Sequence, residues 1–189
     1  MTDKEEKRMV KGLMLMDYIK LIRTAKDIQW DKYLTEEDFE TITGRIVPMG
    51  WYSFETYRNC GKAVLTEIAK GDMNIVKQFG RSFMRNIIDN VYTFLGKTNG
   101  VFEGFQGLDN IGSRFFSFAY PKFEQVGEKS LRVTIVDAPG DELLEALAWQ
   151  LIGSYEFLIE HYGGQEVEID WIKKQWDGDE CVSFNLNWQ

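Results

Sequence analysis

The segment from Asp141 to Trp188 constrains the fold more than any other part of the chain, because its hydrophobic period changes once along its length. Up to Tyr162, apolar residues recur at the spacing of an amphipathic helix. Asp141 is suited to cap the start of this helix, and Gly163 is suited to end it in a left-handed conformation. Beyond Gly164, apolar and polar residues alternate, which is the period of a half-buried strand.

Two alternating strands follow the helix, separated by a turn at Asp177-Gly178-Asp179. An Asp-Gly pair supplies the positive φ that a tight hairpin turn requires. The apolar face of the two strands consists of Val167, Ile169, Trp171, Val182, Phe184, Leu186 and Trp188. We expect this face to pack on the helix, with Trp171 and Phe184 sealing it.

The part of the chain that precedes this segment is mainly helical. Helical spacing of apolar residues predicts helices over 10–25, 35–42, 54–68 and 72–95. Thr35 with Asp38 forms a predicted capping pair, and Asp72 is a predicted cap. From Gly96 to Gly112 the pattern weakens, and we expect the glycines there to break up short helical pieces.

A predicted strand pair over 123–126 and 131–136 lies between the helical part and the last helix. The order of elements predicts an α+β fold: a helical N-terminal part, then an antiparallel sheet (strand pair, long helix, strand pair) packed on helices. We interpret residues 1–189 as a single domain, helical over 8–120, with the sheet and the C-terminal helix over 121–189.

Charge and composition exclude several classes of function. The formal net charge of −8 argues against nucleic acid as a partner, because the phosphate backbone would be repelled. No apolar run approaches the roughly 20 residues of a membrane span, so we expect no transmembrane segment. The charged N-terminus is not a signal peptide, and two widely separated cysteines are typical of a free-thiol, cytoplasmic protein, although a single disulfide stays open.

Several short motifs resemble a known superfamily. They are Lys11-Gly12, Pro48-Met49-Gly50-Trp51-Tyr52, Phe79-Gly80-Arg81, Gly153, Glu156, Gly163-Gly164 and Gly178-Asp179-Glu180-Cys181-Val182-Ser183-Phe184. In these motifs the chain resembles the superfamily that holds 4-vinyl reductase-type ligand-binding domains, heme nitric-oxide-binding domains and TRAPP vesicle-tethering subunits, with uncharacterised bacterial members most alike. The resemblance implies a fold of this type, and it implies small-molecule binding or adaptor work as the function.

The chemistry of the better-known members of this superfamily does not carry over. Heme-binding members use an axial histidine on a central helix and a Tyr-x-Ser-x-Arg motif for the propionates. The single histidine here is His161, in the last turn of the C-terminal helix, and that motif does not occur. We interpret His161 as an ordinary surface residue and expect neither heme nor another cofactor.

The cysteines offer no site either. Members of the 4-vinyl reductase type often have several cysteines near the last hairpin, whereas only Cys181 stands here, and one thiol cannot build a zinc site. TRAPP subunits bury an acyl chain attached to a helical cysteine, and Cys60 is a helical cysteine. We interpret Cys60 as a small core residue, with a lipid or catalytic thiol as the alternative.

The segment 114–120 is the part of the sequence that most resembles a ligand site, because it holds four aromatic residues in seven. With Phe102 and Phe105 close by, these rings are suited to line an apolar pocket with a guanidinium at its mouth. The predicted ligand-binding residues are Arg81, Phe83, Arg114, Phe115, Phe116, Phe118, Tyr120 and Trp149. An aromatic-rich core and a dimer surface are the alternatives that stay open.

These observations together predict a non-enzymatic domain. No nucleophile and base can be paired around the lone histidine, and no metal set is present, so we expect no catalytic residues. The predicted function is small-molecule binding or sensing in bacterial signalling, without heme, with a small apolar or acidic ligand. The alternative is a dimeric interaction adaptor of the TRAPP-subunit type with no ligand, in which case a homodimer or another protein is the partner.

Overall fold

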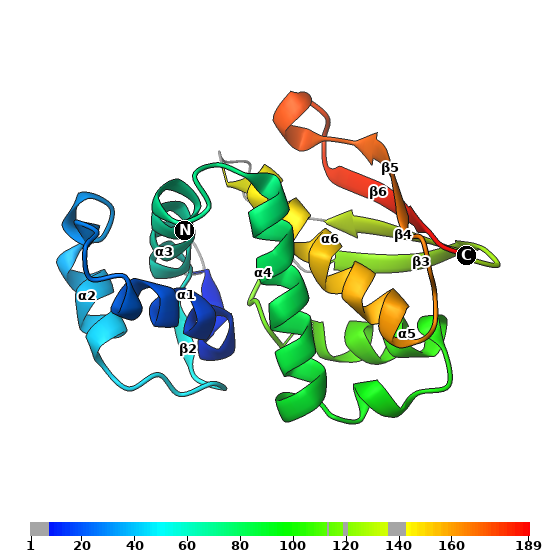
Figure 1. Cartoon of the computed structure of the whole chain (residues 1–189), viewed down its shortest axis with the longest axis horizontal. Coiled ribbons are helices and arrows are strands. Elements are labelled where there is room, and N and C mark those ends of the chain that lie inside the picture. The colour runs from blue at the N-terminus through cyan, green and yellow to red at the C-terminus, as the bar shows by residue number, and fades with distance from the viewer. Residues whose placement is uncertain (1–7, 113, 119–120, 136–142) are drawn as a thin grey trace, which may run out of the picture. The chain divides into compact units, whose positions relative to one another are not determined.

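The computed structural model describes residues 8–112, 114–118, 121–135 and 143–189, which group into two compact units (Figure 1). Unit 1 comprises the described residues up to Gly71 together with Arg114–Phe118. Unit 2 comprises the described residues from Asp72 onward, apart from that segment. The interpretation of the whole chain as one domain remains a prediction.

Unit 1 combines helices with two short strands that the sequence did not reveal. In chain order its elements are β1 (Met9–Lys11), α1 (Gly12–Thr24), α2 (Glu36–Thr43), β2 (Trp51–Ser53) and α3 (Phe54–Glu67). β1 and β2 pair antiparallel, with Val10 opposite Tyr52. The expectation that residues 8–120 are helical is therefore wrong for these strands, which are too short to show an alternating pattern.

The start of α2 was predicted correctly. Thr35 and Asp38 form a capping box, in which the Asp38 amide donates to Thr35 Oγ1 at 3.2 Å and the Thr35 amide donates to Asp38 Oδ2 at 2.9 Å. The carboxylate of Asp38 also accepts a hydrogen bond from Asn59 Nδ2 at 2.8 Å. Since Asn59 belongs to α3, the cap also ties these two helices together.

Unit 2 is built around an antiparallel sheet. Its elements are α4 (Met73–Asn86), α5 (Val101–Gly112), β3 (Pro121–Gly127), β4 (Ser130–Ile135), α6 (Leu144–His161), β5 (Glu168–Lys173) and β6 (Val182–Asn187). The sheet order is β3-β4-β6-β5, so the last strand of the chain lies next to β4 and separates it from β5. The α+β class and the predicted antiparallel sheet are confirmed.

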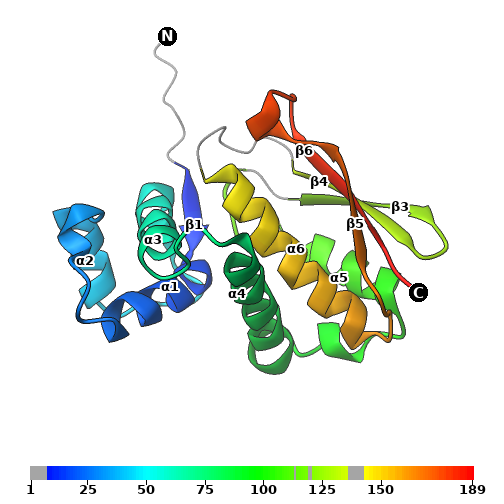
Figure 2. The same ribbon diagram turned by 45° about the horizontal axis from the view of Figure 1, so that its top comes forward.

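The helix α6 lies between α4 and the sheet (Figures 1 and 2). The inward face of the sheet is apolar and buried, with Leu131, Val133, Ile135, Val182, Phe184 and Leu186. On α6 the buried residues lie on more than one side of the helix, among them Ile152 and Leu158 and also Ser154 and Glu156. A helix covered on two sides is expected to be apolar over most of its surface, as α6 is.

Two glycines bring the backbones of α4 and α6 into direct contact. A Cβ atom on Gly80 would lie 1.8 Å from the carbonyl oxygen of Gln150. A Cβ atom on Gly153 would lie 1.9 Å from the carbonyl oxygen of Lys77. Ser154 Oγ adds a hydrogen bond to the carbonyl oxygen of Gly80 at 3.0 Å across the same contact. The two glycines therefore set the distance between the helices.

The end of α6 follows the prediction. Gly163 has a φ of 90°, and its amide donates to the carbonyl oxygen of Glu160. The amide of Gly164 donates to the carbonyl oxygen of Ile159, which completes a Schellman motif. The predicted cap at Asp141 lies outside the described residues.

Three other expectations need correction. α5 is one continuous helix from Val101 to Gly112 rather than short pieces. The helix capped by Asp72, α4, ends at Asn86 rather than near Leu95, and a π-helical turn over Ile87–Val91 follows it. The connection between β5 and β6 is a longer loop with a 3₁₀ turn at Gln175–Asp177, although Gly178 does have a positive φ of 106°.

Candidate functional site

The predicted aromatic–arginine site is divided between the two units. Arg81 and Phe83 belong to α4 and Trp149 to α6, all in unit 2, whereas the segment Arg114–Phe118 belongs to unit 1. Tyr120 lies outside the described residues. A site formed by all eight residues therefore remains a prediction.

Arg81 is already paired with carboxylates of its own unit. Its Nη1 donates to Glu160 Oε1 at 3.0 Å and lies 3.5 Å from Glu156 Oε2. The hydrogen bond to Glu160 and the negative charges of both glutamates raise the pKa of Arg81. Glu156 is buried and also pairs with Lys77 Nζ at 2.6 Å. Arg81 thus holds α4 against α6, and in this structure its guanidinium is occupied by the protein's own acids.

The aromatic residues of the segment 114–118 pack inside unit 1. The ring centroid of Phe118 lies 4.6 Å from that of Phe54, and the centroid of Phe116 lies 6.0 Å from that of Tyr57. Phe115 is buried, and the carbonyl oxygen of Phe115 accepts a hydrogen bond from the amide of Lys11 at 2.8 Å. These contacts are those of an aromatic core, the alternative that the sequence left open for this segment.

Trp149 lies on the side of α6 that faces the sheet. Its ring centroid is 5.6 Å from that of Trp171 on β5, and Trp171 in turn lies 5.3 Å from Phe184 on β6. The predicted role of Trp171 and Phe184 in sealing this helix is thereby confirmed. Phe83, on α4, is half-buried.

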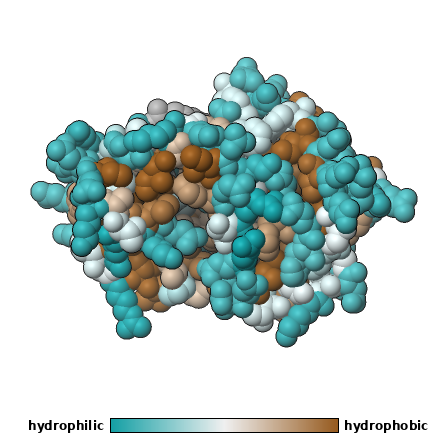
Figure 3. Space-filling view, viewed as in Figure 1, coloured by the Kyte–Doolittle hydropathy of each residue, from teal (hydrophilic) through white to brown (hydrophobic). Residues whose placement is uncertain are grey.

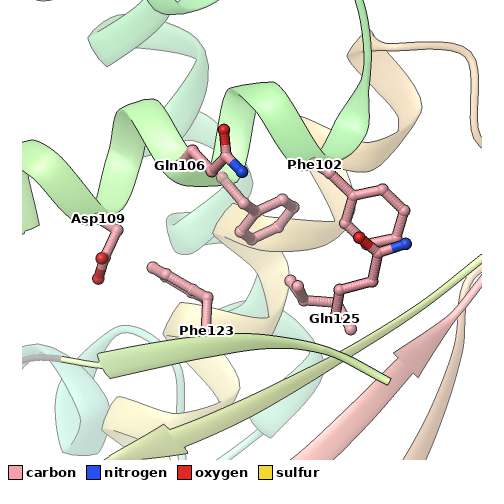
Figure 4. Close-up of a pocket in the computed structure, with 7 residues that line it drawn as sticks. Phe102, Gln106, Asp109, Phe123 and Gln125 are labelled. Atoms are coloured by element: carbon pink, nitrogen blue, oxygen red, sulfur yellow. The ribbon is translucent and has the colours of Figure 1, made fainter. Parts of the chain in front are cut away.

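A pocket of about 120 Å³ lies between α5 and β3, within unit 2 (Figure 4). Its lining residues are Phe102, Phe105, Gln106, Asp109, Phe123, Gln125 and Leu131. The four that belong to α5 share one face because positions three and four apart are neighbours on a helix. Phe123 and Gln125 share one face of β3 because side chains alternate along a strand, and Leu131 is the β4 partner of Gln125.

Aromatic rings form the floor of this pocket. The ring centroids of Phe105 and Phe123 are 5.1 Å apart in an edge-to-face arrangement, and each lies within 5.6 Å of Tyr155 on α6. Burial raises the pKa of Tyr155 well above its usual value. The phenol of Tyr155 therefore stays neutral, and its ring packs against both phenylalanines.

Polar groups surround the opening. Gln106 and Asp109 project from the exposed side of α5, and Gln125 projects from β3, where its amide also donates to the carbonyl oxygen of Gly127 at 3.1 Å. Figure 4 shows the Asp109 side chain extending from α5 toward the strand that carries Phe123. Small-molecule sites commonly combine apolar walls with a few placed polar groups, and this pocket has that composition.

The sequence indicated only part of this pocket. Phe102 and Phe105 were named as pocket candidates, but Gln106, Asp109, Phe123 and Gln125 were not. The signal was the spacing of positions 102, 105, 106 and 109, which describes one helix face. It was missed because the glycines at 104 and 107 were interpreted as breaks in the helix.

Metal ligands, membrane-spanning helices and reactive thiols are the other features to look for among the described residues. Among them no three His, Cys, Asp or Glu side chains are grouped as metal ligands, and no helix is long and apolar enough to cross a membrane. Cys60 is fully buried, as predicted, and burial, with the charge of Asp38, raises the pKa of its thiol to about 12. Cys181 is a free, half-buried thiol.

Comparisons with known proteins identify the fold. No family model and no curated protein matches the chain. Among solved structures, the unliganded Fe(II) H-NOX protein from K. algicida is similar, with 18% identity, a TM-score of 0.68 and coverage of 95% of this chain and 96% of that chain. A mutant H-NOX protein from S. oneidensis in the Fe(II) state shares 10% identity over 95% of this chain and 96% of that chain, with a TM-score of 0.69.

A third similar structure is a mutant of the T. tengcongensis H-NOX, with 12% identity, a TM-score of 0.64 and coverage of 95% of this chain and 97% of that chain. Identities this low establish the fold alone. The expected likeness of the fold to heme nitric-oxide-binding domains is confirmed. The 4-vinyl reductase and TRAPP branches receive no support from these comparisons.

The likeness to H-NOX structures in the Fe(II) state raises the question of whether residues of this chain fit heme. Heme iron in proteins is held by an axial ligand, commonly a histidine, and His161 is the single histidine of this chain. His161 is exposed at the C-terminal end of α6, where its Nε2 lies 3.3 Å from the carbonyl oxygen of Gly96 and its ring packs beside Phe157 and Tyr162. A histidine whose ring contacts the backbone of Gly96 and two aromatic side chains does not fit the role of axial ligand.

Proposed function

We propose that this chain is a non-enzymatic small-molecule-binding domain with a sensory or regulatory role in bacterial signalling, and that it works without heme. The observation that carries the proposal is the pocket between α5 and β3, in which aromatic walls meet a few polar groups. The similarity of the fold to H-NOX proteins supports a sensory role by analogy.

The absence of heme from the proposal rests on His161. Its ring nitrogen is close to the carbonyl oxygen of Gly96, and its ring contacts two aromatic neighbours, so it contributes to the fold. The buried Cys60 is no better suited, since a thiol whose pKa is raised to about 12 stays protonated and only a thiolate binds a metal. The ligand of the proposed domain therefore contacts protein side chains directly.

One observation favours a second candidate, the interaction adaptor. In unit 1 the loop before β2 and the start of that strand expose Val47, Met49 and Trp51, which are 53%, 48% and 44% accessible. Lys11 Nζ lies 3.7 Å from the centre of the Trp51 ring. Exposed aromatic and aliphatic side chains beside a cation are typical of protein contact surfaces, and Figure 3 shows further hydrophobic areas among the hydrophilic ones.

Native mass spectrometry of the purified full-length chain distinguishes the two candidates. We expect the spectrum to contain a species heavier than the chain by the mass of one small molecule, which is released on collisional activation. A homodimer with nothing bound would contradict the ligand-binding proposal and support the adaptor. Turnover on a general substrate panel would contradict both, because each assigns no catalysis to the chain.

The cellular compartment of the domain is a separate part of the proposal. We propose that the domain works in the cytoplasm, and two free cysteines support this, because that compartment keeps thiols reduced.

A further inference from the structure

We infer that the pocket between α5 and β3 binds a small organic cation, a protonated amine carried on a single ring. This inference rests on the proposed function, since it names the ligand class of the same domain, and it differs from the small apolar or acidic ligand expected from the sequence. It is drawn from the size of the pocket, from the charge at its opening and from the chemistry of its walls.

The size of the pocket limits the ligand to one ring. An engineered protein cavity of about 150 Å³ holds a molecule of benzene. The pocket here is about 120 Å³ and opens to solvent on the side of Gln106 and Asp109, so a ring fits inside while a substituent projects outward. Drug-sized ligands occupy pockets of roughly 300 Å³ or more, which excludes a large ligand such as a nucleotide.

The charge at the opening favours a cation. Asp109 is the one charged side chain among the lining residues, and in the described part of the chain no lysine or arginine forms an ion pair with it. Arg81 shows the contrast, since its charge is met by two glutamates of its own unit. A carboxylate without a counter-ion at the mouth of a pocket with aromatic walls attracts a cation and repels an anion.

The walls favour the same ligand. The faces of aromatic rings carry negative electrostatic potential, so phenylalanines at positions 102, 105 and 123 attract a nearby ammonium group and also pack on an apolar ring. An ammonium group has donors and no acceptor. The carboxylate of Asp109 and the side-chain carbonyls of Gln106 and Gln125 are acceptors around the opening, so the polar groups match what the cation offers.

Titration of the full-length ¹⁵N-labelled protein with benzylamine at pH 7 tests the inference by NMR. We expect the amide signals of residues 102–109 and 123–125 to shift together, with a Kd of about 1 mM or below, as suits a ligand with few atoms. Benzyl alcohol, a neutral compound of similar shape, is expected to bind roughly fivefold more weakly, because it lacks the charge that Asp109 attracts.

Two variants assign the effect to Asp109. Asp109→Asn is expected to weaken benzylamine binding about fivefold and to leave benzyl alcohol unchanged, since the amide keeps the shape and removes the charge. Glu124→Gln is the matched control. Glu124 lies on the same strand as Phe123 but on the opposite face, where it is 4.0 Å from Arg132, so its loss should leave both titrations unchanged.

Each other outcome has a definite meaning. Equal binding of the amine and the alcohol, or no effect of Asp109→Asn, would overturn the cationic ligand class and keep the pocket as a binding site. No shift around the pocket with either probe would overturn the pocket as the site. A small molecule retained in the native mass spectrum would still support the proposed function in both cases, so the two claims fail separately.

Discussion

Gly153→Ala is expected to lower the free energy of unfolding by about 3 kcal/mol, because α4 and α6 touch through their backbones at this position. The added Cβ would lie 1.9 Å from the carbonyl oxygen of Lys77 and 2.8 Å from its carbonyl carbon. A backbone cannot move aside as a side chain does, so the helices must separate or unwind locally. Overpacking usually costs about 1–3 kcal/mol and occasionally more, and a clash with backbone is expected to exceed that range, at about 4 kcal/mol. A gain of about 1 kcal/mol in helix propensity offsets part of this cost.

Urea unfolding followed by far-ultraviolet circular dichroism measures this loss. Gly112→Ala is the matched control, since this glycine belongs to helix α5, as its last residue, and a Cβ there meets nothing within 4 Å. The control is expected to be as stable as the wild type or slightly more stable. If Gly153→Ala were equally well tolerated, the close approach of α4 and α6 would be wrong.

Glu156→Ala is expected to cost about 2 kcal/mol of stability. The substitution removes the carboxylate that pairs with Lys77 Nζ at 2.6 Å and with Arg81 Nη1 at 3.5 Å. Removing one partner of a buried ion pair costs about 3–5 kcal/mol, and the value is lower here because the Lys77 and Arg81 side chains are partly exposed. In this variant Arg81 still pairs with Glu160, whereas Lys77 loses its carboxylate partner Glu156.

Glu180→Ala is the control for this second prediction. Glu180 pairs with Lys173, and its own side chain is largely exposed, so its loss should leave the stability essentially unchanged. The same urea titration measures both variants. Equal effects of the two substitutions would mean that the Glu156 cluster is no more important than a surface ion pair.

The C-terminal part of the fold could be predicted from the sequence because local pattern and tertiary packing agree there. The alternation over Val182–Asn187 places Val182, Phe184 and Leu186 in the core, and the Gly163-Gly164 pair ends α6 in the expected left-handed turn. Each of these features is fixed by residues that are close in sequence. The same holds for the capping box at Thr35.

The continuous course of α5 could not be predicted, because its glycines make room for side chains that are distant in the sequence. A Cβ on Gly104 would lie 2.1 Å from the ring of Tyr162, and one on Gly107 would lie 2.7 Å from the side chain of Leu95. The glycines thus allow these side chains to pack closely on α5. Judged by helix propensity alone, the same glycines indicate breaks in a helix. The strands β1 and β2 were missed because each has only three residues.

The candidate site was predicted in part for the same reason. Phe102 and Phe105 stood out by composition, but their partners on β3 become neighbours only through the packing of the sheet on α5. Arg81 was one of the predicted ligand-binding residues, but in the structure it pairs with Glu160, which lies far along the chain. Long-range charge pairing is not visible in a local pattern.

The absorption spectrum of the purified full-length chain after addition of heme tests the central claim most directly. We predict that no sharp Soret band depends on His161, so that wild type and His161→Ala give the same broad absorption of loosely associated heme. The reason is the position of this histidine at the exposed end of α6, close to the carbonyl oxygen of Gly96. A sharp Soret band in the wild type that disappears in His161→Ala would contradict the account.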